Sequence, residues 1–152
     1  MMLEHDYDKY PELTNNQLND LRFTSPHPQI EEDFDAVVVK VHDGDSITLR
    51  TSFRDFDFPL RLLDIDAPEL NKGGVEAREW LKGLLLNHHV KVLINKSMRV
   101  GKYGRLLGKV LFNGLDVGQE ELHLGLAKPF EAKEEGGIPD IKKYFRQNKI
   151  WS

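Results

Sequence analysis

The sequence predicts an α+β fold, mainly a small closed β-barrel of five strands with three helices, and three observations lead to this prediction. The chain has 152 residues, which is one domain with enough length to bury a core. Five short segments have the β-branched or alternating pattern of strands and end at turn signals. A strongly amphipathic helix is inserted after the third segment, which favours a closed barrel over an open parallel sheet.

The expected strands are short and are separated by recognisable turns. Ala36–Val41 is a β-branched run, and Asp43-Gly44 is a turn signal after it. Beyond this turn, Ile47 and Leu49 alternate with polar residues. Three further strands follow similar patterns: Phe58–Leu63, Val90–Ile94, and Leu106–Phe112 with the tight turn Asn113-Gly114 after it.

Three helices complete the expected fold. The helix at Val75–His88 has one apolar face, formed by Ala77, Trp80, Leu81, Leu84 and Leu85. A second helix is expected at Val117–Leu124, closed by Gly125. A third is expected to begin at Pro139, a favourable first-turn residue. Five short strands with helices in these places favour an OB-type barrel.

The charge is divided unevenly along the chain. Residues 1–35 carry nine acidic and two basic residues, whereas residues 36–152 carry 16 acidic and 19 basic residues. The formal net charge of −4 therefore arises in the leading segment, and the remainder is mildly basic. We predict an acidic N-terminal arm over residues 1–35, with a short helix near Asn15–Phe23, and a barrel domain over residues 36–152.

Composition excludes several classes of protein. The chain has no cysteine, so it has no disulfide framework, thiolate metal site or cysteine nucleophile. No apolar run approaches the roughly 18–20 residues of a membrane span. The leading residues are too acidic and polar for a secretory signal peptide. We therefore expect no membrane partner and no obligatory protein partner. The chain as given is expected either to be cytoplasmic or to have been separated from a signal peptide.

Three clusters of charged residues stand out: His42–Ser46, Arg61–Glu69 and Lys102–Arg105. The second cluster is otherwise apolar, and its charges need partners or a ligand, because an unpaired buried charge costs several kcal/mol. Arg61 and Asp66 are five residues apart, so a regular strand would place them on opposite faces. The chain must bend between them if they share a site.

These clusters contain the side chains of a phosphodiester-cleaving site. Asp45 and Asp66, with Glu69 nearby, provide the oxygen ligands that Ca²⁺ or Mg²⁺ prefers. Arg61 and Arg105 provide guanidinium groups that match phosphate oxygens. A metal and two arginines stabilise charge on a phosphoryl group, and a spare carboxylate can position or deprotonate the attacking water.

Each cluster also has a purely structural interpretation. Asp43-Gly44 is a common turn signal, and Lys102–Arg105 can be an ordinary basic loop. Arg61 can simply pair with Asp64 or Asp66. The occurrence of all three clusters in one chain favours the chemical interpretation.

The chain resembles the staphylococcal (micrococcal) nuclease family, also called thermonuclease-like, in four segments that occur in order: DGDS, RLLDIDAPE, KYGR, and a helix closed by GLA. The resemblance covers roughly residues 35–128. It implies an OB barrel with three helices. It also implies a Ca²⁺-dependent hydrolase that cleaves DNA and RNA with little sequence specificity and leaves 3′-phosphate ends.

The resemblance implies a role for each motif residue. Asp45 and Asp66 would bind Ca²⁺ together with the backbone carbonyl of Ala67, and Glu69 would orient or activate water. Arg61 and Arg105 would bind the phosphate and stabilise the transition state. Lys102 and Tyr103 would contact a neighbouring phosphate, and Asp43 would support the metal site.

Two of the departures from the family pattern concern Asp64 and the segment after Ala127. Asp64 stands where the family has an apolar residue or glycine. On a regular strand Asp64 would share the face of Asp66 and strengthen cation binding; alternatively it pairs with a basic residue elsewhere. The tyrosines that pack on a nucleotide base in the family are not matched after Ala127, where Phe130 is either a substitute or a core aromatic.

We therefore expect a metal-dependent endo- or exonuclease that acts on DNA, RNA or both, with Ca²⁺ as cofactor. The alternative is a noncatalytic nucleic-acid-binding OB-fold module, like the degenerate nuclease domains of some larger proteins. Such modules usually lose the carboxylates or arginines, all of which are present in this chain.

Overall fold

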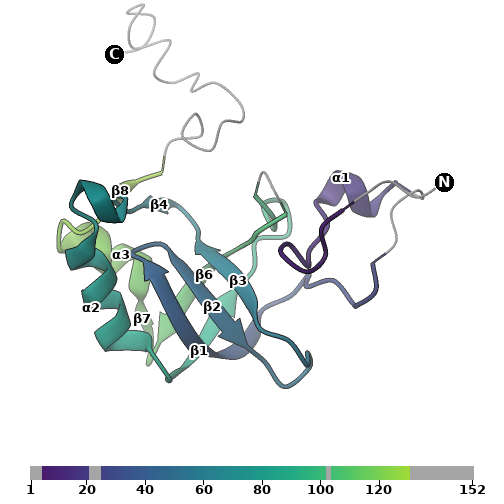
Figure 1. Cartoon of the computed structure of the whole chain (residues 1–152), viewed down its shortest axis with the longest axis horizontal. Helices are drawn as coiled ribbons and strands as arrows, with labels where there is room; N and C mark the ends of the chain where they lie inside the picture. Colours follow the sequence, from purple (N-terminus) through teal and green to yellow (C-terminus); the bar gives the residue numbers. More distant parts are fainter. Residues whose placement is uncertain (1–4, 21–24, 102–103, 131–152) are drawn as a thin grey trace, which may run out of the picture.

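The structure is a computed structural model that describes residues 5–20, 25–101 and 104–130 (Figure 1). Its barrel is formed by the strands β1 (Phe34–Asp43), β2 (Ser46–Arg50), β3 (Phe58–Leu62), β5 (His89–Leu93) and β6 (Leu106–Phe112). All five overlap the predicted strands. β1 extends beyond the predicted Ala36–Val41 at both ends and begins within the segment that we assigned to the arm.

The barrel is closed by a mixed set of strand pairs. β1, β2 and β3 form an antiparallel meander, β5 pairs with the other edge of β1, and β6 is antiparallel to β5. β3 and β6 then pair in parallel, with Arg61 opposite Leu107, and this pairing joins the two edges of the sheet. The predicted five-stranded barrel and its α+β class are confirmed.

The core lies inside the barrel, because alternate residues of each strand face inward. In β6, for example, Leu106 and Val110 are buried. β3 departs from this pattern, because Arg61 is buried as well as its neighbours Leu60 and Leu62. Alternation places Arg61 on the outer face of the barrel, so other elements must cover its charge.

The helix α2 (Val75–Leu85) packs on β1 and ends before the predicted end at His88. The chain turns at Asn87, which has φ +67°. The Asn87 N–H then donates to the Val38 carbonyl at 2.7 Å, and the His88 carbonyl accepts from the Val38 N–H at 3.1 Å. These hydrogen bonds to β1 replace the last helical turn, which an apolar spacing pattern alone does not reveal.

The helix α3 (Val117–His123) agrees with the predicted Val117–Leu124. Asp116 caps its N-terminus by accepting a hydrogen bond from the Gln119 N–H at 3.2 Å. Gly125, with φ +72°, follows its C-terminus in the left-handed conformation that glycine adopts without strain.

The helix α1 (Asn15–Leu18) lies within the predicted Asn15–Phe23. The helix expected from Pro139 lies outside the described residues. Among the helices in the described ranges, none has the length and apolar character needed to cross a membrane.

Short elements absent from the sequence prediction complete the fold. They are β4 (Ile65–Asp66), which pairs with β8 (Lys128–Pro129), β7 (Leu115–Asp116), which pairs with β6, and the 3₁₀ turn η1 (Leu70–Lys72). Two-residue strands are too short to show alternation. The β4–β8 pair lies beside α2 and α3 at one end of the barrel (Figure 1).

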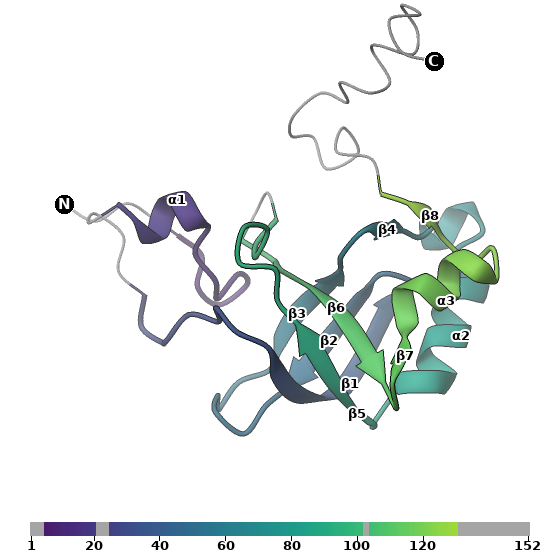
Figure 2. The same cartoon turned by 180° about the vertical axis from the view of Figure 1, so that it is seen from behind.

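The described part of the N-terminal segment packs near the β5–β6 loop, away from α2 and α3 (Figure 2). Glu12 is fully buried and pairs with two buried guanidinium groups, those of Arg54 and Arg99. Arg99 also donates to the carbonyls of Ile30 at 2.7 Å and Leu13 at 3.1 Å. One carboxylate thus fixes the N-terminal segment to two parts of the barrel.

The same segment covers the loop before β6. Gly104 has φ +90°, and a Cβ on it would lie 2.9 Å from the Glu12 carbonyl oxygen and 3.1 Å from the Tyr10 Cβ. Glycine is required there both by the left-handed backbone and by the close approach. The N-terminal segment therefore supports the loop that leads into Arg105.

Replacing Glu12 by glutamine should lower the free energy of unfolding by about 3–5 kcal/mol, because two buried guanidinium groups lose their counter-charge. Urea denaturation measures the difference. The matched control is Asp57→Asn, which breaks the exposed pair of Arg50 and Asp57 and should leave the midpoint unchanged. Equal midpoints for Glu12→Gln and the wild-type protein would contradict a stabilising role for the buried cluster.

Candidate active site

Arg61 brings the two predicted metal carboxylates together. Its Nη2 atom lies 3.4 Å from Asp45 Oδ2 and 3.3 Å from Asp66 Oδ1. Its Nη1 atom donates to the Leu62 carbonyl at 3.2 Å. Arg61 and Asp45 are buried, whereas Asp66 is partly exposed. Three residues from two separate sequence motifs thus form one cluster.

The chain bends between Arg61 and Asp66, as their spacing requires. β3 ends at Leu62, and β4 begins at Ile65. Between the two strands, Asp64 has φ +70° and is exposed. The bend replaces the regular strand that would have placed Asp64 and Asp66 on one face.

The turn between β1 and β2 holds Asp45 in place. Asp43 Oδ1 accepts from the Asp45 N–H at 3.1 Å, and Asp45 Oδ2 accepts from the Ala67 N–H at 2.8 Å. A Cβ on Gly44 would come within 2.7 Å of the Ala67 Cβ and 2.8 Å of the Ala77 Cβ. Gly44 is therefore required by close packing, since its φ is not in the left-handed region.

The pKa of Asp45 is raised to about 7, mainly by burial. A side-chain hydrogen bond with Asp43 and the charge of Asp43 act in the same direction, against the opposing effects of the Arg61 charge and the Ala67 N–H. The ionised form of Asp45 therefore gains from any additional positive charge nearby. This property suits a ligand of a cation.

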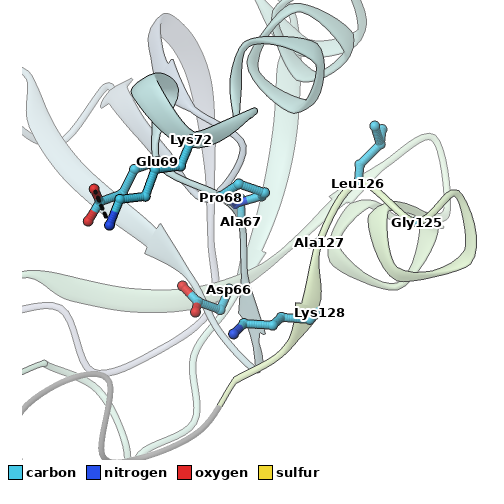
Figure 3. Close-up of a pocket in the computed structure, with 9 residues that line it drawn as sticks. All are labelled: Asp66, Ala67, Pro68, Glu69, Lys72, Gly125, Leu126, Ala127 and Lys128. Carbon is cyan, nitrogen blue, oxygen red and sulfur yellow. Dashed lines mark ion pairs between the residues drawn. The ribbon is translucent and has the colours of Figure 1, made fainter.

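A cleft of about 700 Å³ opens beside the cluster (Figure 3). Two segments line it: Asp66, Ala67, Pro68, Glu69 and Lys72 from the first, and Gly125, Leu126, Ala127 and Lys128 from the second. Glu69 is exposed at the start of η1, with Oε2 4.0 Å from the Lys72 Nζ. In Figure 3 the charged ends of Asp66, Glu69, Lys72 and Lys128 extend toward the same side. The cleft therefore combines carboxylate and ammonium groups in a space open to solvent.

Arg105 stands immediately before β6, and strand register relates it to Arg61. Arg61 pairs with Leu107 across the parallel β3–β6 ladder, so the outward alternation of β6 puts Arg105 on the same face of the barrel as Arg61. Arg105 is half-buried, and its carbonyl accepts from the Gly101 N–H at 2.8 Å. The predicted phosphate contacts Lys102 and Tyr103 lie outside the described residues.

Phe130 packs on the site itself. Its ring centroid lies 5.1 Å from the Arg61 Cζ, a cation–π contact, and its N–H donates to the Asp64 carbonyl at 3.1 Å. Lys72 and Lys128 were not identified from the sequence. Lys128 reaches the cleft because it pairs with Asp66 in the β4–β8 ladder, a pairing that no sequence pattern reveals.

Glu121 is another residue that sequence reasoning missed. It lies in α3, fully buried, and neither carboxylate oxygen has a hydrogen-bond partner among the described residues. Burial, followed by the charges of Asp45 and Asp43, raises the pKa of Glu121 to about 9. A signal was present in the sequence, since Glu121 is four residues after Val117 and therefore shares the buried face of the helix.

The donors at this site fit a hard divalent cation such as Ca²⁺. Asp45 and Asp66 offer only oxygen ligands, and burial raises the pKa of Asp45, so a nearby cation would favour its ionised form. Within the described ranges, no three His, Asp or Glu side chains are grouped closely enough to hold a metal ion by themselves. Other oxygen atoms, such as the Ala67 carbonyl, would have to complete the coordination.

Glu121→Gln should make the protein more stable at pH 8, by more than about 1 kcal/mol. The raised pKa means that the fold favours protonated Glu121, so its contribution is full below the ordinary pKa of 4.5 and is lost as the pH rises toward 9. Glutamine removes this loss. Urea unfolding at pH 5 and pH 8 with a chelator measures it, and Glu120→Gln on the same helix is the control. A wild-type pH dependence retained in Glu121→Gln would refute the prediction.

Comparison with known proteins identifies the family of the chain. The family model of staphylococcal nuclease homologues matches residues 59–149. A protein named probable endonuclease lcl3 from Aspergillus niger is 34% identical over 125 residues, which are 69% of this chain and 44% of that protein. A probable endonuclease lcl3 from Aspergillus flavus is 33% identical over 119 residues, covering 66% and 42% of the two chains.

A further relative is a probable endonuclease LCL3 from Leptosphaeria maculans, 33% identical over 98 residues, covering 57% of this chain and 32% of that protein. The chain thus spans less than half the length of these relatives. The matched family region includes Arg61, Asp66, Glu69 and Arg105 and covers more than half of the 152 residues. The chain belongs to the staphylococcal nuclease family.

Proposed function

We propose that this chain is a nuclease that hydrolyses phosphodiester bonds of DNA or RNA, with Ca²⁺ as its cofactor and 3′-phosphate ends as its products. The observation that carries the proposal is the meeting of Asp45, Arg61 and Asp66 beside a cleft that also contains Glu69. These groups can bind a cation, bind a phosphate and act on water. The names of the endonuclease relatives support the same chemistry.

The acidic and the basic residues of the site would bind different groups. Asp45 and Asp66, with the Ala67 carbonyl, would hold the cation, which when bound neutralises charge on the phosphoryl oxygens. Arg61 and Arg105 would bind the phosphate and stabilise the charge that builds on it in the transition state. Arginine stays protonated at neutral pH, so both act as fixed positive charges and not as proton donors.

Glu69 would act on the attacking water. Its side chain is exposed at the cleft, and its 4.0 Å interaction with Lys72 is weak enough to exchange for a new partner. The carboxylate would orient a water molecule and accept its proton as the water oxygen attacks phosphorus. The bond from phosphorus to the 5′-oxygen breaks, this oxygen takes up a proton from solvent water to become a hydroxyl, and the phosphate remains on the 3′ side.

The full chain should cleave single-stranded DNA when Ca²⁺ is present and should lose this activity in a chelator. Denaturing gel electrophoresis follows the cleavage. Treating the products with a phosphatase specific for 3′ ends, and comparing their mobility, identifies the termini. Cleavage that is independent of Ca²⁺ would contradict the proposed cofactor, and products that carry 5′-phosphate would contradict the proposed 3′-phosphate ends. Absence of any cleavage would remove the nuclease assignment.

Variants at the site should separate chemistry from binding. Arg61→Lys keeps a positive charge beside the buried Asp45 but loses the planar guanidinium, and we expect kcat to fall by about 10²–10³-fold. Glu69→Gln should reduce kcat by about 10²–10⁴-fold, because the amide cannot accept the proton. Fluorescence anisotropy with uncleaved DNA should show a much smaller change in affinity.

The matched control for these variants is Arg50→Lys, at an exposed guanidinium that pairs with Asp57 away from the cleft. Its kcat should equal that of the wild-type protein. Unchanged rates in Arg61→Lys and Glu69→Gln would show that the site is elsewhere. DNA binding without turnover in the wild-type protein would favour the noncatalytic nucleic-acid-binding module.

A further inference from the structure

Glu121 is a buried acid that the proposed mechanism does not use. It is 0% exposed, and both carboxylate oxygens lack hydrogen-bond partners among the described residues. Glu12 is equally buried, but two guanidinium groups pair with it. A carboxylate without such partners costs several kcal/mol to bury. An unsatisfied buried group of this kind points to something that the protein binds.

The Glu121 carboxylate faces the turn that presents Asp45. Its Oε1 atom lies 2.9 Å from the position that a Cβ on Gly44 would occupy. The same position is 2.7 Å from the Ala67 Cβ, so Glu121 and Ala67 approach Gly44 together. The through-space charges that act on Glu121 are those of Asp45 and Asp43, the two aspartates of the turn.

Backbone hydrogen bonds connect Glu121 to the cleft as well. The Leu126 N–H donates to the Glu121 carbonyl at 2.9 Å, and the Ala127 N–H approaches the same oxygen at 3.3 Å. Leu126 and Ala127 line the cleft. Glu121 therefore lies between the Asp43–Asp45 turn and the cleft wall, and its position is fixed by main-chain contacts.

We propose that Glu121 stands beside the cation site, without being a ligand of the ion, and that its carboxyl group next to the Asp43–Asp45 turn strengthens the binding of a divalent cation. The inference rests on the proposed function, since the cation is the one that Asp45 and Asp66 would hold. A dication brings two positive charges to a carboxylate that has no ion-pair partner in the described part of the chain. Glu121 thus lowers the stability of the cation-free protein and raises its affinity for the cation.

Isothermal titration calorimetry with Ca²⁺ tests the inference on the full chain. Glu121→Gln should raise the Kd for Ca²⁺ by about tenfold, because one negative charge near the dication is lost. Thermal unfolding adds a second readout. Without Ca²⁺ the variant should have the higher Tm, and saturating Ca²⁺ should raise the Tm of the wild-type protein by more than that of the variant. A merely structural role would not couple higher stability to weaker cation binding.

Two further variants complete the experiment. Glu120→Gln removes the same charge from the partly exposed neighbour on α3 and should leave the Kd unchanged. Glu121→Met replaces the carboxylate by an apolar side chain of similar length and should weaken Ca²⁺ binding as glutamine does. A wild-type Kd in both Glu121 variants would overturn the inference and leave the proposed function intact. A wild-type protein that binds no Ca²⁺ would overturn both.

Discussion

The cost of removing carboxylates from water governs the end of the barrel where the β1–β2 turn, β4 and α3 meet. Asp45 and Glu121 are both buried there, and burial raises the pKa of each. Arg61 offsets part of this cost, because its buried guanidinium lies between Asp45 and Asp66. One guanidinium group cannot balance three acids in a low-dielectric site. The carboxyl groups that this single guanidinium group leaves without enough counter-charge are the physical reason to propose a divalent cation beside the cleft.

Among the residues that the structure describes, a further buried acid, Glu12, is placed in the opposite way. Glu12 is paired with Arg54 and Arg99, and this cluster attaches the N-terminal segment to the barrel. The attached segment then packs against Gly104 and supports the loop that leads into Arg105. A buried carboxylate with ion-pair partners therefore holds the scaffold, whereas buried carboxyl groups with too few such partners are concentrated where we propose that substrate and cation bind.

Sequence patterns predicted the barrel strands and the helices α2 and α3 because the apolar spacing typical of each element continues over several residues. The prediction failed where a distant partner decides the outcome. α2 ends early because Asn87 and His88 bond to Val38 of β1, and Lys128 reaches the cleft through a two-residue strand. A bend between Arg61 and Asp66 was predicted for a shared site, but its position at Asp64 was not. Asp64 adopts a positive φ there, and the residue is exposed.

The sequence by itself determined the class of fold, the family and the residue types of the site, because periodicity, turn residues and motifs depend on neighbours along the chain. Only the tertiary structure decided which charges meet. The parallel pairing of β3 with β6 aligns Arg61 with Leu107, and a shift by one residue would turn Arg61 to the other face. Likewise, Glu121 looks like one acid among several in the sequence. Glu121 becomes buried beside the Asp43–Asp45 turn only when α3 packs against the barrel.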